Sequence, residues 1–314
     1  MQLPSAVVMV RPASFGFNPD TAPSFMFQRE ITDNSRKEIE RRARSEFDIL
    51  AGRLREAGVE VIIVEDKEDL NTPDAVFPNN WVSFHHDGTV VLYPMLAPSR
   101  RPERRRDIIE KLESSGFRVS RVVDLTHHEN EGRFLEGTGS VVFDHADRTA
   151  YANLSPRTNE QVLDELCGSL GYKPMTFRAA QENGDAILHT DMMMSVGDRF
   201  AIFCGESIAD PGERKRVLDT LKSSGREIIP IDLKQLERFA GNVLQLRTKD
   251  DGSALVISTS ACLALRPEQR DAIQKFTRIV ESPLPLFESI GRGSARCMMA
   301  DVHLPRRERT AERC

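Results

Sequence analysis

The sequence predicts an α/β fold in which five similar units form a five-bladed α/β propeller with pseudo-fivefold symmetry. Three observations predict it. A helix followed by a short strand recurs along the chain, a β-hairpin lies between successive helices, and both recur about every 55 residues. Units of this size cannot each bury an apolar face alone, and no polar caps mark the two ends, so we expect a closed ring rather than an open solenoid.

The helical part of each unit has a recognisable end. Four segments combine a helical pattern, a glycine and a short apolar strand: FDILAGRLREAGVEVIIVED, RRDIIEKLESSGFRVSRVVDL, NEQVLDELCGSLGYKPMTF and ERKRVLDTLKSSGREIIPIDL. Their glycines suit the left-handed conformation that closes a helix; they are Gly58, Gly116, Gly171 and Gly225. A fifth segment, PEQRDAIQKFTRIVESPLPLFES, has the helix and an extended run without the glycine.

The hairpins complete the ββαβ pattern. They read WVSFHHDGTVVLYPM, SVVFDHADRTAYANL, MMSVGDRFAIFCGE and VLQLRTKDDGSALVIS, with turns at Gly88, Asp147, Asp198 and Gly252. Because hairpins pair strands antiparallel, the alternative of a doubly wound parallel sheet is disfavoured. We therefore expect residues 1–305 to form a single domain and residues 306–314 to form a basic tail.

Composition excludes several classes of function. The chain has 314 residues, 29% of them charged, and a net charge of -5, so no basic excess favours a nucleic-acid partner. No apolar run predicts a membrane span, and we expect no signal peptide. Five scattered cysteines without a CxxC motif indicate a cytoplasmic protein with reduced thiols. The arginine runs at 99–106 and 305–313 are expected on the surface, and a homo-oligomer is left open.

Polar and reactive residues recur where each strand after a helix gives way to the next hairpin. These junctions read PDAVFPNNW, RFLEGTGS, AILHTDMMMS, FAGNVLQL and GSARCMMA, and they contain Asn80, Glu136, His189 with Asp191, Asn242, and Cys297. Successive members lie 53 to 56 residues apart. A shared repeat phase places all five junctions at one end of the ring, so we expect these side chains to converge on its axis.

The converging residues suit covalent catalysis. A cysteine attacks as its thiolate and needs a nearby proton acceptor, which His189 can provide near neutral pH. Glu136 can orient the imidazole, and Asp191 lies two residues after His189 on the same face of a strand. Such a pocket suits a planar, cationic carbon such as that of a guanidinium. We expect no metal and no cofactor.

Plainer interpretations exist for the same residues. Free cysteines and lone histidines are often structural, and Met192 to Met194 are expected in the core. The pairs His85-His86 and His127-His128-Glu129 resemble metal ligands, but adjacent strand residues point to opposite faces, so we expect them on the surface. The glycines before Cys297 are expected to leave room for a substrate.

At the junctions the sequence resembles a known family. EGTGS, HTD and GSARCMM are similar to motifs of the guanidino-group-modifying enzymes, whose pentein fold has five ββαβ blades. Together with VVMVRPASFGFNPDTAPSFMFQ and VFPNNW, they most resemble the citrulline utilisation hydrolase, or amidinotransferase-like, branch, over residues 5–305. Arginine deiminases and dimethylarginine dimethylaminohydrolases belong to the same superfamily.

The resemblance implies roles for individual residues. Cys297 matches the nucleophile, His189 the general acid/base and Glu136 the carboxylate of the family's ExG motif. Asp191 matches the residue that holds the guanidino or ureido nitrogens, and Arg157 an arginine near the substrate's carboxylate. Asn242 and Asp74 are further substrate-binding candidates, and Arg11 is a weaker match to the same arginine as Arg157. Asn18, Phe27 and Gln28 lie in the N-terminal motif without an assigned role.

One departure shifts the expected substrate. Deiminases carry an aspartate in an FxRD motif, whereas this chain has FPNN, so Asn80 replaces a carboxylate. An amide can donate to a ureido oxygen, and dihydrolase relatives also have asparagine there. The resemblance thus implies hydrolysis of citrulline or an arginine-like substrate through a cysteine intermediate, with ornithine, ammonia and carbon dioxide formed from citrulline. Alternatives are an arginine or methylarginine deiminase-type hydrolase, an amidinotransferase and a non-enzymatic binding scaffold.

Overall fold

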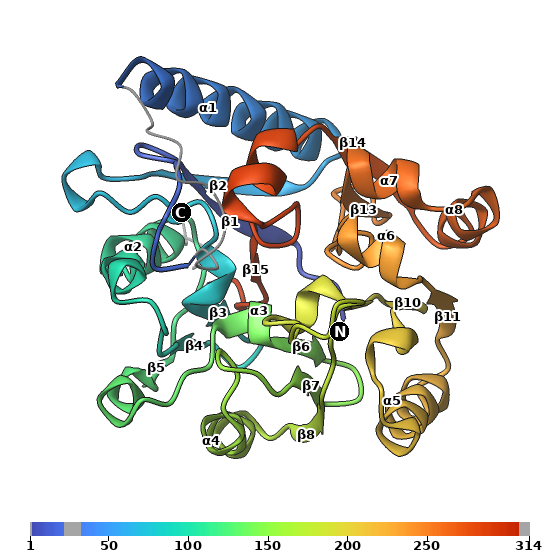
Figure 1. Ribbon diagram of the computed structural model, residues 1–314. Coiled ribbons are helices and arrows are strands. Elements are labelled where there is room, and N and C mark those ends of the chain that lie inside the picture. The colour runs from blue at the N-terminus through green and yellow to red at the C-terminus, as the bar shows by residue number, and fades with distance from the viewer. Residues whose placement is uncertain (1, 22–32, 308–314) are drawn as a thin grey trace, which may run out of the picture.

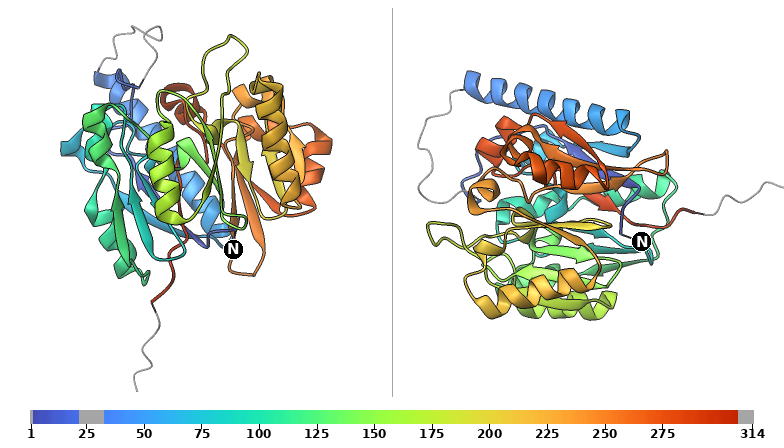
Figure 2. Two further views of the ribbon diagram at one scale, coloured as in Figure 1. Left: turned by 90° about the horizontal axis from the view of Figure 1, so that it is seen from below. Right: turned by 90° about the vertical axis from the view of Figure 1, so that its right-hand side faces the viewer.

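The computed structural model describes residues 2–21 and 33–307 and shows the predicted mixture of helices and strands. Within these ranges the strands form one six-stranded and three three-stranded sheets. The longer helices α1, α2, α4, α5 and α8 lie on the outside and the strands nearer the middle, as Figure 1 and the two views in Figure 2 show. No helix in the described ranges is long and apolar enough to cross a membrane.

The strands are β1 (Ala6–Arg11), β2 (Glu60–Glu65), β3 (Val82–Phe84), β4 (Thr89–Leu92), β5 (Arg121–Asp124), β6 (Val141–Asp144), β7 (Thr149–Asn153), β8 (Lys173–Phe177), β9 (Met194–Val196), β10 (Phe200–Phe203), β11 (Glu227–Pro230), β12 (Leu244–Arg247), β13 (Ser253–Ser258), β14 (Arg278–Ser282) and β15 (Ala300–Val302). The α-helices are α1 (Asp33–Glu56), α2 (Arg106–Ser114), α3 (Gly137–Ser140), α4 (Glu160–Leu170), α5 (Pro211–Ser223), α6 (Leu233–Glu237), α7 (Thr259–Ala264) and α8 (Pro267–Gln274). Short 3-10 helices are η1 (Glu68–Leu70), η2 (Pro78–Asn80), η3 (Pro98–Glu103), η4 (Thr126–Glu131), η5 (Thr190–Met192) and η6 (Gly205–Ser207), and η7 (Phe287–Gly291) is a π-helix.

One pairing pattern recurs in all four sheets. A short strand pairs antiparallel with the next, and the latter pairs parallel with a strand that follows a helix, as in β6-β7-β8 and β12-β13-β14. The six-stranded sheet contains the pattern twice, in β15-β1-β2 and β3-β4-β5, joined by one parallel bridge between Val302 and Phe84. The antiparallel pairs are incompatible with the doubly wound alternative. β15 also brings the C-terminal part of the chain beside the N-terminal strand β1.

Helix α4 illustrates how the glycine-terminated helices form. The side chain of Asn159 accepts hydrogen bonds from the backbone N–H groups of Gln161 and Val162, an N-cap worth about 1 kcal/mol. At the other end Gly171 has a φ of 72° and donates its N–H to the carbonyl of Cys167. A side chain there would be strained, because only glycine adopts the left-handed region freely. The other three predicted helix-closing glycines also have positive φ.

The long helix α1 is held by an apolar stripe. Phe47, Leu50 and Leu54 are completely buried and lie on one face of the helix at spacings of three and four residues. They belong to the same apolar cluster as Val7 and Met9 of β1. Each such side chain contributes about 1.5–3 kcal/mol on burial, so packing rather than helix propensity fixes α1.

Several surface predictions are wrong. Arg100 and Arg105, from the first arginine run, are only 3% and 8% exposed. His85 is buried beneath the β3–β4 turn, where its Nε2 bonds to the hydroxyl of Ser83. His128 is buried, and its ring lies against the ring of His127. Both residues belong to the 3-10 helix η4 and not to a strand, so they do not point to opposite faces.

The second arginine run is only partly described. Arg306 and Arg307 are exposed but attached to the neighbourhood of α2: Arg306 stacks on the ring of Phe117, and Arg307 bonds to Glu113. Residues 308–314 lie outside the described residues.

Candidate active site

Short turns and helical segments bring the predicted site residues together. Asn80 ends η2, Glu136 precedes α3, and His189 and Asp191 lie at η5. Asn242 and Cys297 come from turns before β12 and β15. The junctions touch directly: Asn79 of η2 donates to Asp191, and Asn242 donates to the backbone carbonyl of Asp191 at 3.2 Å. The predicted convergence is therefore present in the structure.

Glycines allow these segments to approach one another so closely. A Cβ atom on Gly137 would collide with the backbone carbonyl of Asn79, and one on Gly241 would lie 2.5 Å from the carbonyl oxygen of Met192. A Cβ on Gly139 would collide with Asn80 Nδ2 and lie 3.1 Å from His189 Nδ1. Asn80 Nδ2 and His189 Nδ1 thus flank the same glycine.

The thiol of Cys297 is buried against polar groups. Its side chain is 4% exposed, and its Sγ lies 3.2 Å from Asn242 Nδ2 and 3.6 Å from Asp191 Oδ2. Burial, followed by the charge of Asp191, raises the pKa of the Cys297 thiol well above its usual value. Burial also raises the pKa of Asp191. Without a substrate, the sulfur is therefore a thiol that donates towards the carboxylate.

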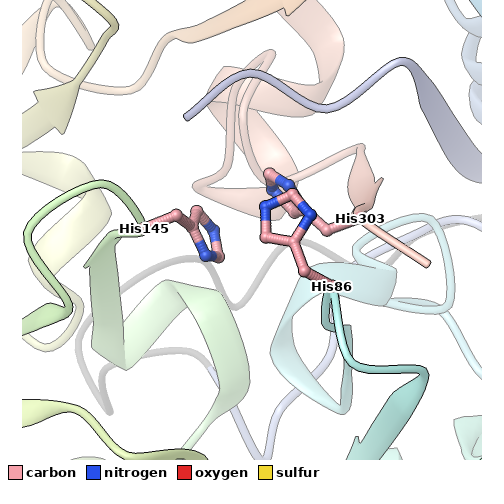
Figure 3. A group of neighbouring side chains, drawn as sticks. All are labelled: His86, His145 and His303. Carbon is pink, nitrogen blue, oxygen red and sulfur yellow. The ribbon is translucent and has the colours of Figure 1, made fainter. Parts of the chain in front are cut away.

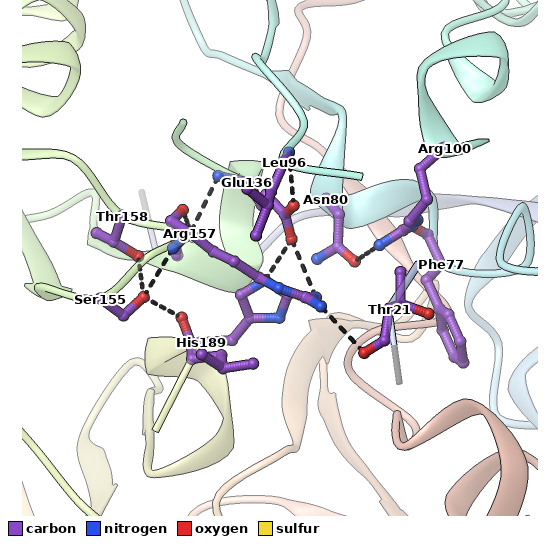
Figure 4. Close-up of polar contacts among 12 residues, drawn as sticks. Thr21, Phe77, Asn80, Leu96, Arg100, Glu136, Ser155, Arg157, Thr158 and His189 are labelled. Carbon is purple, nitrogen blue, oxygen red and sulfur yellow. Dashed lines mark hydrogen bonds and ion pairs between the residues drawn. The ribbon is translucent and has the colours of Figure 1, made fainter. Parts of the chain in front are cut away.

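Glu136 anchors the histidine. His189 Nε2 lies 2.7 Å from Glu136 Oε2, and Arg157 Nη1 lies 3.3 Å from the same oxygen (Figure 4). Burial alone would raise the pKa of Glu136, but Arg157, His189 and Arg100 outweigh it and hold that pKa at about 2. The carboxylate consequently keeps its charge and accepts a hydrogen bond from the Nε2–H of His189, which leaves Nδ1 for proton transfer.

A buried arginine orients Asn80. Arg100 Nη1 donates to Asn80 Oδ1 at 2.8 Å (Figure 4). The Nε and Nη2 of the same guanidinium pair with Glu103. Burial lowers the pKa of Arg100, but Glu103 and Asp74 outweigh burial and raise it, so the guanidinium remains charged. An arginine has only donors. The amide of Asn80 must therefore present its oxygen to Arg100 and its Nδ2 to the site.

Two predicted substrate-binding residues lie further from the thiol. Asp74 is buried and accepts hydrogen bonds from Asn18 Nδ2 at 2.8 Å and from the hydroxyl of Thr21 at 3.0 Å. It therefore holds the end of the first described segment. Arg11 instead forms ion pairs with Asp48 and Glu65 at the end of β1, and the structure does not bring it to Cys297. Phe27 and Gln28 lie outside the described residues.

Sequence reasoning missed three side chains and misassigned two glycines. Arg100 lies in an arginine run that was expected on the surface, and it bonds to Asn80. Asn79 donates a hydrogen bond to Asp191. Arg296, the residue before Cys297, pairs with Asp301. Asn79 could have been found from its place in the FPNN junction. The glycines at 291 and 293 pack against the ring of Phe77, with Cβ positions 2.8 and 2.7 Å from it, and make room for that ring.

Comparisons with known proteins give the family and the fold of the chain. A family model described as "N,N dimethylarginine dimethylhydrolase, eukaryotic" matches residues 11–304. No curated protein matches the chain. Among solved structures, the apo structure of ArgZ, an arginine dihydrolase from the ornithine-ammonia cycle in cyanobacteria, superimposes with a TM-score of 0.72 at 18% identity. That match covers 96% of this chain but only 41% of ArgZ.

Two further structures have matching lengths. The N-terminal domain of ArgZ with bound product gives a TM-score of 0.71 at 18% identity and covers 96% of this chain and 99% of that one. A dimethylarginine dimethylaminohydrolase with an S-methyl-L-thiocitrulline adduct gives 0.63 at 16% identity, with 95% and 99% covered. At such identities these likenesses show a shared fold.

The fold and the family match together define a guanidino-group-modifying enzyme of the pentein superfamily. It is a hydrolase of non-peptide C–N bonds. More particularly, the chain belongs to the N,N-dimethylarginine dimethylhydrolase family, whose model spans almost all of it.

Proposed function

We propose that this enzyme hydrolyses the ureido group of citrulline, or a guanidino group followed by the ureido group that it leaves, through a covalent intermediate on Cys297. Citrulline would give ornithine, ammonia and carbon dioxide. In this proposal residues 1–305 act as one catalytic domain, and the repeated strand groups are five blades of a ring around the site.

The orientation of Asn80 carries the proposal. Its Nδ2 and the Oδ1 of Asp191 are buried and have no hydrogen-bond partner among the described residues. One is a donor and the other an acceptor. A ureido group offers a carbonyl oxygen to the donor and N–H groups to the acceptor, so it satisfies both. A guanidinium has only donors and would leave Asn80 Nδ2 unpaired, at a cost of about 1–3 kcal/mol.

The first chemical step forms a thioester-like bond to carbon. Cys297 Sγ attacks the ureido carbon, and the thiol proton passes by way of His189 to the terminal nitrogen. The C–N bond breaks, ammonia leaves, and an S-carbamoyl group remains on Cys297. Glu136 stabilises the imidazolium that forms transiently, because its pKa of about 2 keeps it ionised.

The second step restores the enzyme. His189 removes a proton from water, the resulting hydroxide attacks the S-carbamoyl carbon, and the C–S bond breaks with protonation of Cys297. The released carbamate loses carbon dioxide to give the amine. Every atom is supplied by substrate and water, so neither step needs an oxidant, a reductant or a cofactor.

Arg157 takes a supporting role in this scheme. Its Nη1 pairs with Glu136 and its Nη2 donates to the carbonyl of Thr21. We propose that Arg157 holds Glu136 and the chain at Thr21 in place, whereas the resemblance alone assigned it to the substrate's carboxylate. Asp74 supports Thr21 from the other side through its hydroxyl.

One incubation series tests the proposal. Purified protein is supplied separately with citrulline, arginine, monomethylarginine, dimethylarginine and succinylarginine, and ammonia, amines and amino-acid products are counted. We expect ammonia and ornithine from citrulline in equal amounts. One ammonia per arginine with citrulline accumulating would instead identify a deiminase and overturn the proposal.

Dimethylarginine hydrolysis is the second candidate, because the matching family model bears that description. It would release dimethylamine, which the same series detects. An amidinotransferase would use the same cysteine but require an amine acceptor. Adding glycine to the arginine incubation distinguishes it, since a transferase would form guanidinoacetate and ornithine.

A further inference from the structure

Three histidines that the proposed reaction does not use lie together on the molecule (Figure 3). His86 lies in the turn between β3 and β4, His145 in the turn between β6 and β7, and His303 directly after β15. One ligand atom from each residue lies within 4.8 Å of the others. We propose that these three histidines bind a single divalent transition-metal ion of the zinc type.

The strands explain why these residues meet. Three of the strands that begin at the active site each end at one histidine of the cluster: β3 separates Asn80 from His86, β6 separates Glu136 from His145, and β15 separates Cys297 from His303. The convergence that assembles the active site at one end of these strands therefore assembles the histidines at the other end. The cluster is consequently separate from the catalytic thiol by the length of a strand.

The hydrogen bonds of His303 and His145 are those typical of metal-binding histidines. His303 is 5% exposed, its Nε2 bonds to Asp301 Oδ2 at 3.0 Å, and its buried Nδ1 has no partner among the described residues. The Nδ1 of His145 bonds to the hydroxyl of Tyr172 at 2.7 Å, which leaves its Nε2 for an ion. A hydrogen bond to the second ring nitrogen fixes the tautomer and orientation of metal-binding histidines.

The ligand set indicates the type of ion. Imidazole nitrogens suit zinc, copper and nickel, whereas calcium and magnesium prefer oxygen. Three histidines with a fourth position open to water form a common zinc arrangement, with Zn–N distances of about 2.0–2.1 Å. Tetrahedral coordination at this distance sets ligand nitrogens about 3.4 Å apart, so the three nitrogens must approach one another by up to about 1.4 Å. His86 is exposed at the turn, so it can make this movement and gives the ion a path from solvent.

A second cluster provides an internal comparison. His127, His128 and Glu165 also lie within bonding reach of one another, but His128 Nε2 already pairs with Glu165 at 2.8 Å. His128 Nδ1 also lies 3.6 Å from a carboxylate oxygen of Glu131, so both ring nitrogens of His128 already face acidic groups of the protein. A change at exposed His127 therefore serves as the matched control for a change at His86.

Metal binding tests the proposal directly. The metal-free protein is titrated with Zn²⁺ against a chromophoric chelator, and with Co²⁺ while the visible absorption of tetrahedral cobalt is followed. We expect saturable binding to the wild-type chain, weakened at least 100-fold in His86→Ala and about 10–100-fold in Tyr172→Phe. His127→Ala should bind as the wild type does. Melting temperatures without metal show whether each variant folds.

Two results would overturn the proposal. One is the absence of saturable Zn²⁺ or Co²⁺ binding by the folded wild-type protein. The other is an unchanged affinity in folded His86→Ala, or a loss in His127→Ala that equals it, because the ion would then bind elsewhere. The readout is metal binding, so it is independent of whether citrulline is the substrate.

Discussion

Arg100 Nη1 lies 2.8 Å from the side-chain oxygen of Asn80, and this one hydrogen bond decides which end of the amide faces the active site. The arginine is itself fixed by two hydrogen bonds to Glu103, each 2.8–2.9 Å long. Both residues are buried, so rotation of the amide would leave Arg100 Nη1 facing a second donor. Selectivity for a ureido oxygen thus depends on a residue that does not touch the substrate in the proposed reaction.

Asn80→Asp should reverse the preference. A carboxylate has no donor, so it cannot bond to a ureido oxygen but attracts a guanidinium. We expect kcat/KM for citrulline to fall about 10–100-fold, equivalent to about 1.4–3 kcal/mol, while the first ammonia from arginine is retained or released faster. Ammonia release from both substrates measures the ratio. Full citrulline activity in a folded Asn80→Asp variant would contradict the assignment of Asn80 Nδ2.

Cys297→Ser should abolish turnover without unfolding the protein. Serine is nearly isosteric with cysteine but a much poorer nucleophile at this buried position, so we expect a loss of at least about 1,000-fold. Intact-protein mass spectrometry of quenched reactions should show a covalent adduct on the wild type and none on the variant. Cys262→Ser is the matched control, since Cys262 lies in α7. Ammonia release by Cys297→Ser near the wild-type rate would rule out Cys297 as the nucleophile.

Glu136 should make the stability of the protein depend on acid pH. Its pKa is about 2 in the folded state, against about 4.3 in an unfolded chain. A lowered carboxylate pKa contributes stability that is complete above the unfolded value and lost as pH falls towards 2. The contribution is of the order of 3 kcal/mol. Urea unfolding at pH 7, 4 and 3 should therefore show a smaller loss for Glu136→Gln than for the wild type, and equal losses would contradict it.

The site residues that lie at equivalent positions of the repeat could be predicted from the sequence. Cys297, His189 and Glu136 occupy equivalent positions in three of the repeat units, so their spacing alone indicated that they meet. Arg100 has no such equivalent, and an arginine run is usually solvated. Its burial depends on η3 folding back over η2, which is a tertiary contact that no local pattern specifies.

The histidine cluster likewise depends on tertiary contacts that the sequence pattern does not specify. His86, His145 and His303 are scattered over more than two hundred residues, and only the ends of β3, β6 and β15 bring them together. Their neighbours in sequence suggested the wrong grouping, since His85 turns inward to Ser83 while His86 faces the cluster. The hairpin period located the turns, but not which turns lie side by side.

Gly139→Ala should separate the geometry of the site from the stability of the fold. The added methyl group would collide with Asn80 Nδ2 and lie 3.1 Å from His189 Nδ1, so both must move. Because displacement of reacting groups by about 1 Å can reduce the rate about 100-fold, we expect a loss of that order in kcat/KM for citrulline.

Gly168→Ala is the matched control. This glycine lies in α4 with nothing within 4 Å of its Cβ position, and alanine there should raise the free energy of unfolding by about 0.5–1 kcal/mol. Activity and urea unfolding are measured for both variants. A Gly139→Ala variant with wild-type activity would show that the space above this glycine is not where Asn80 and His189 act.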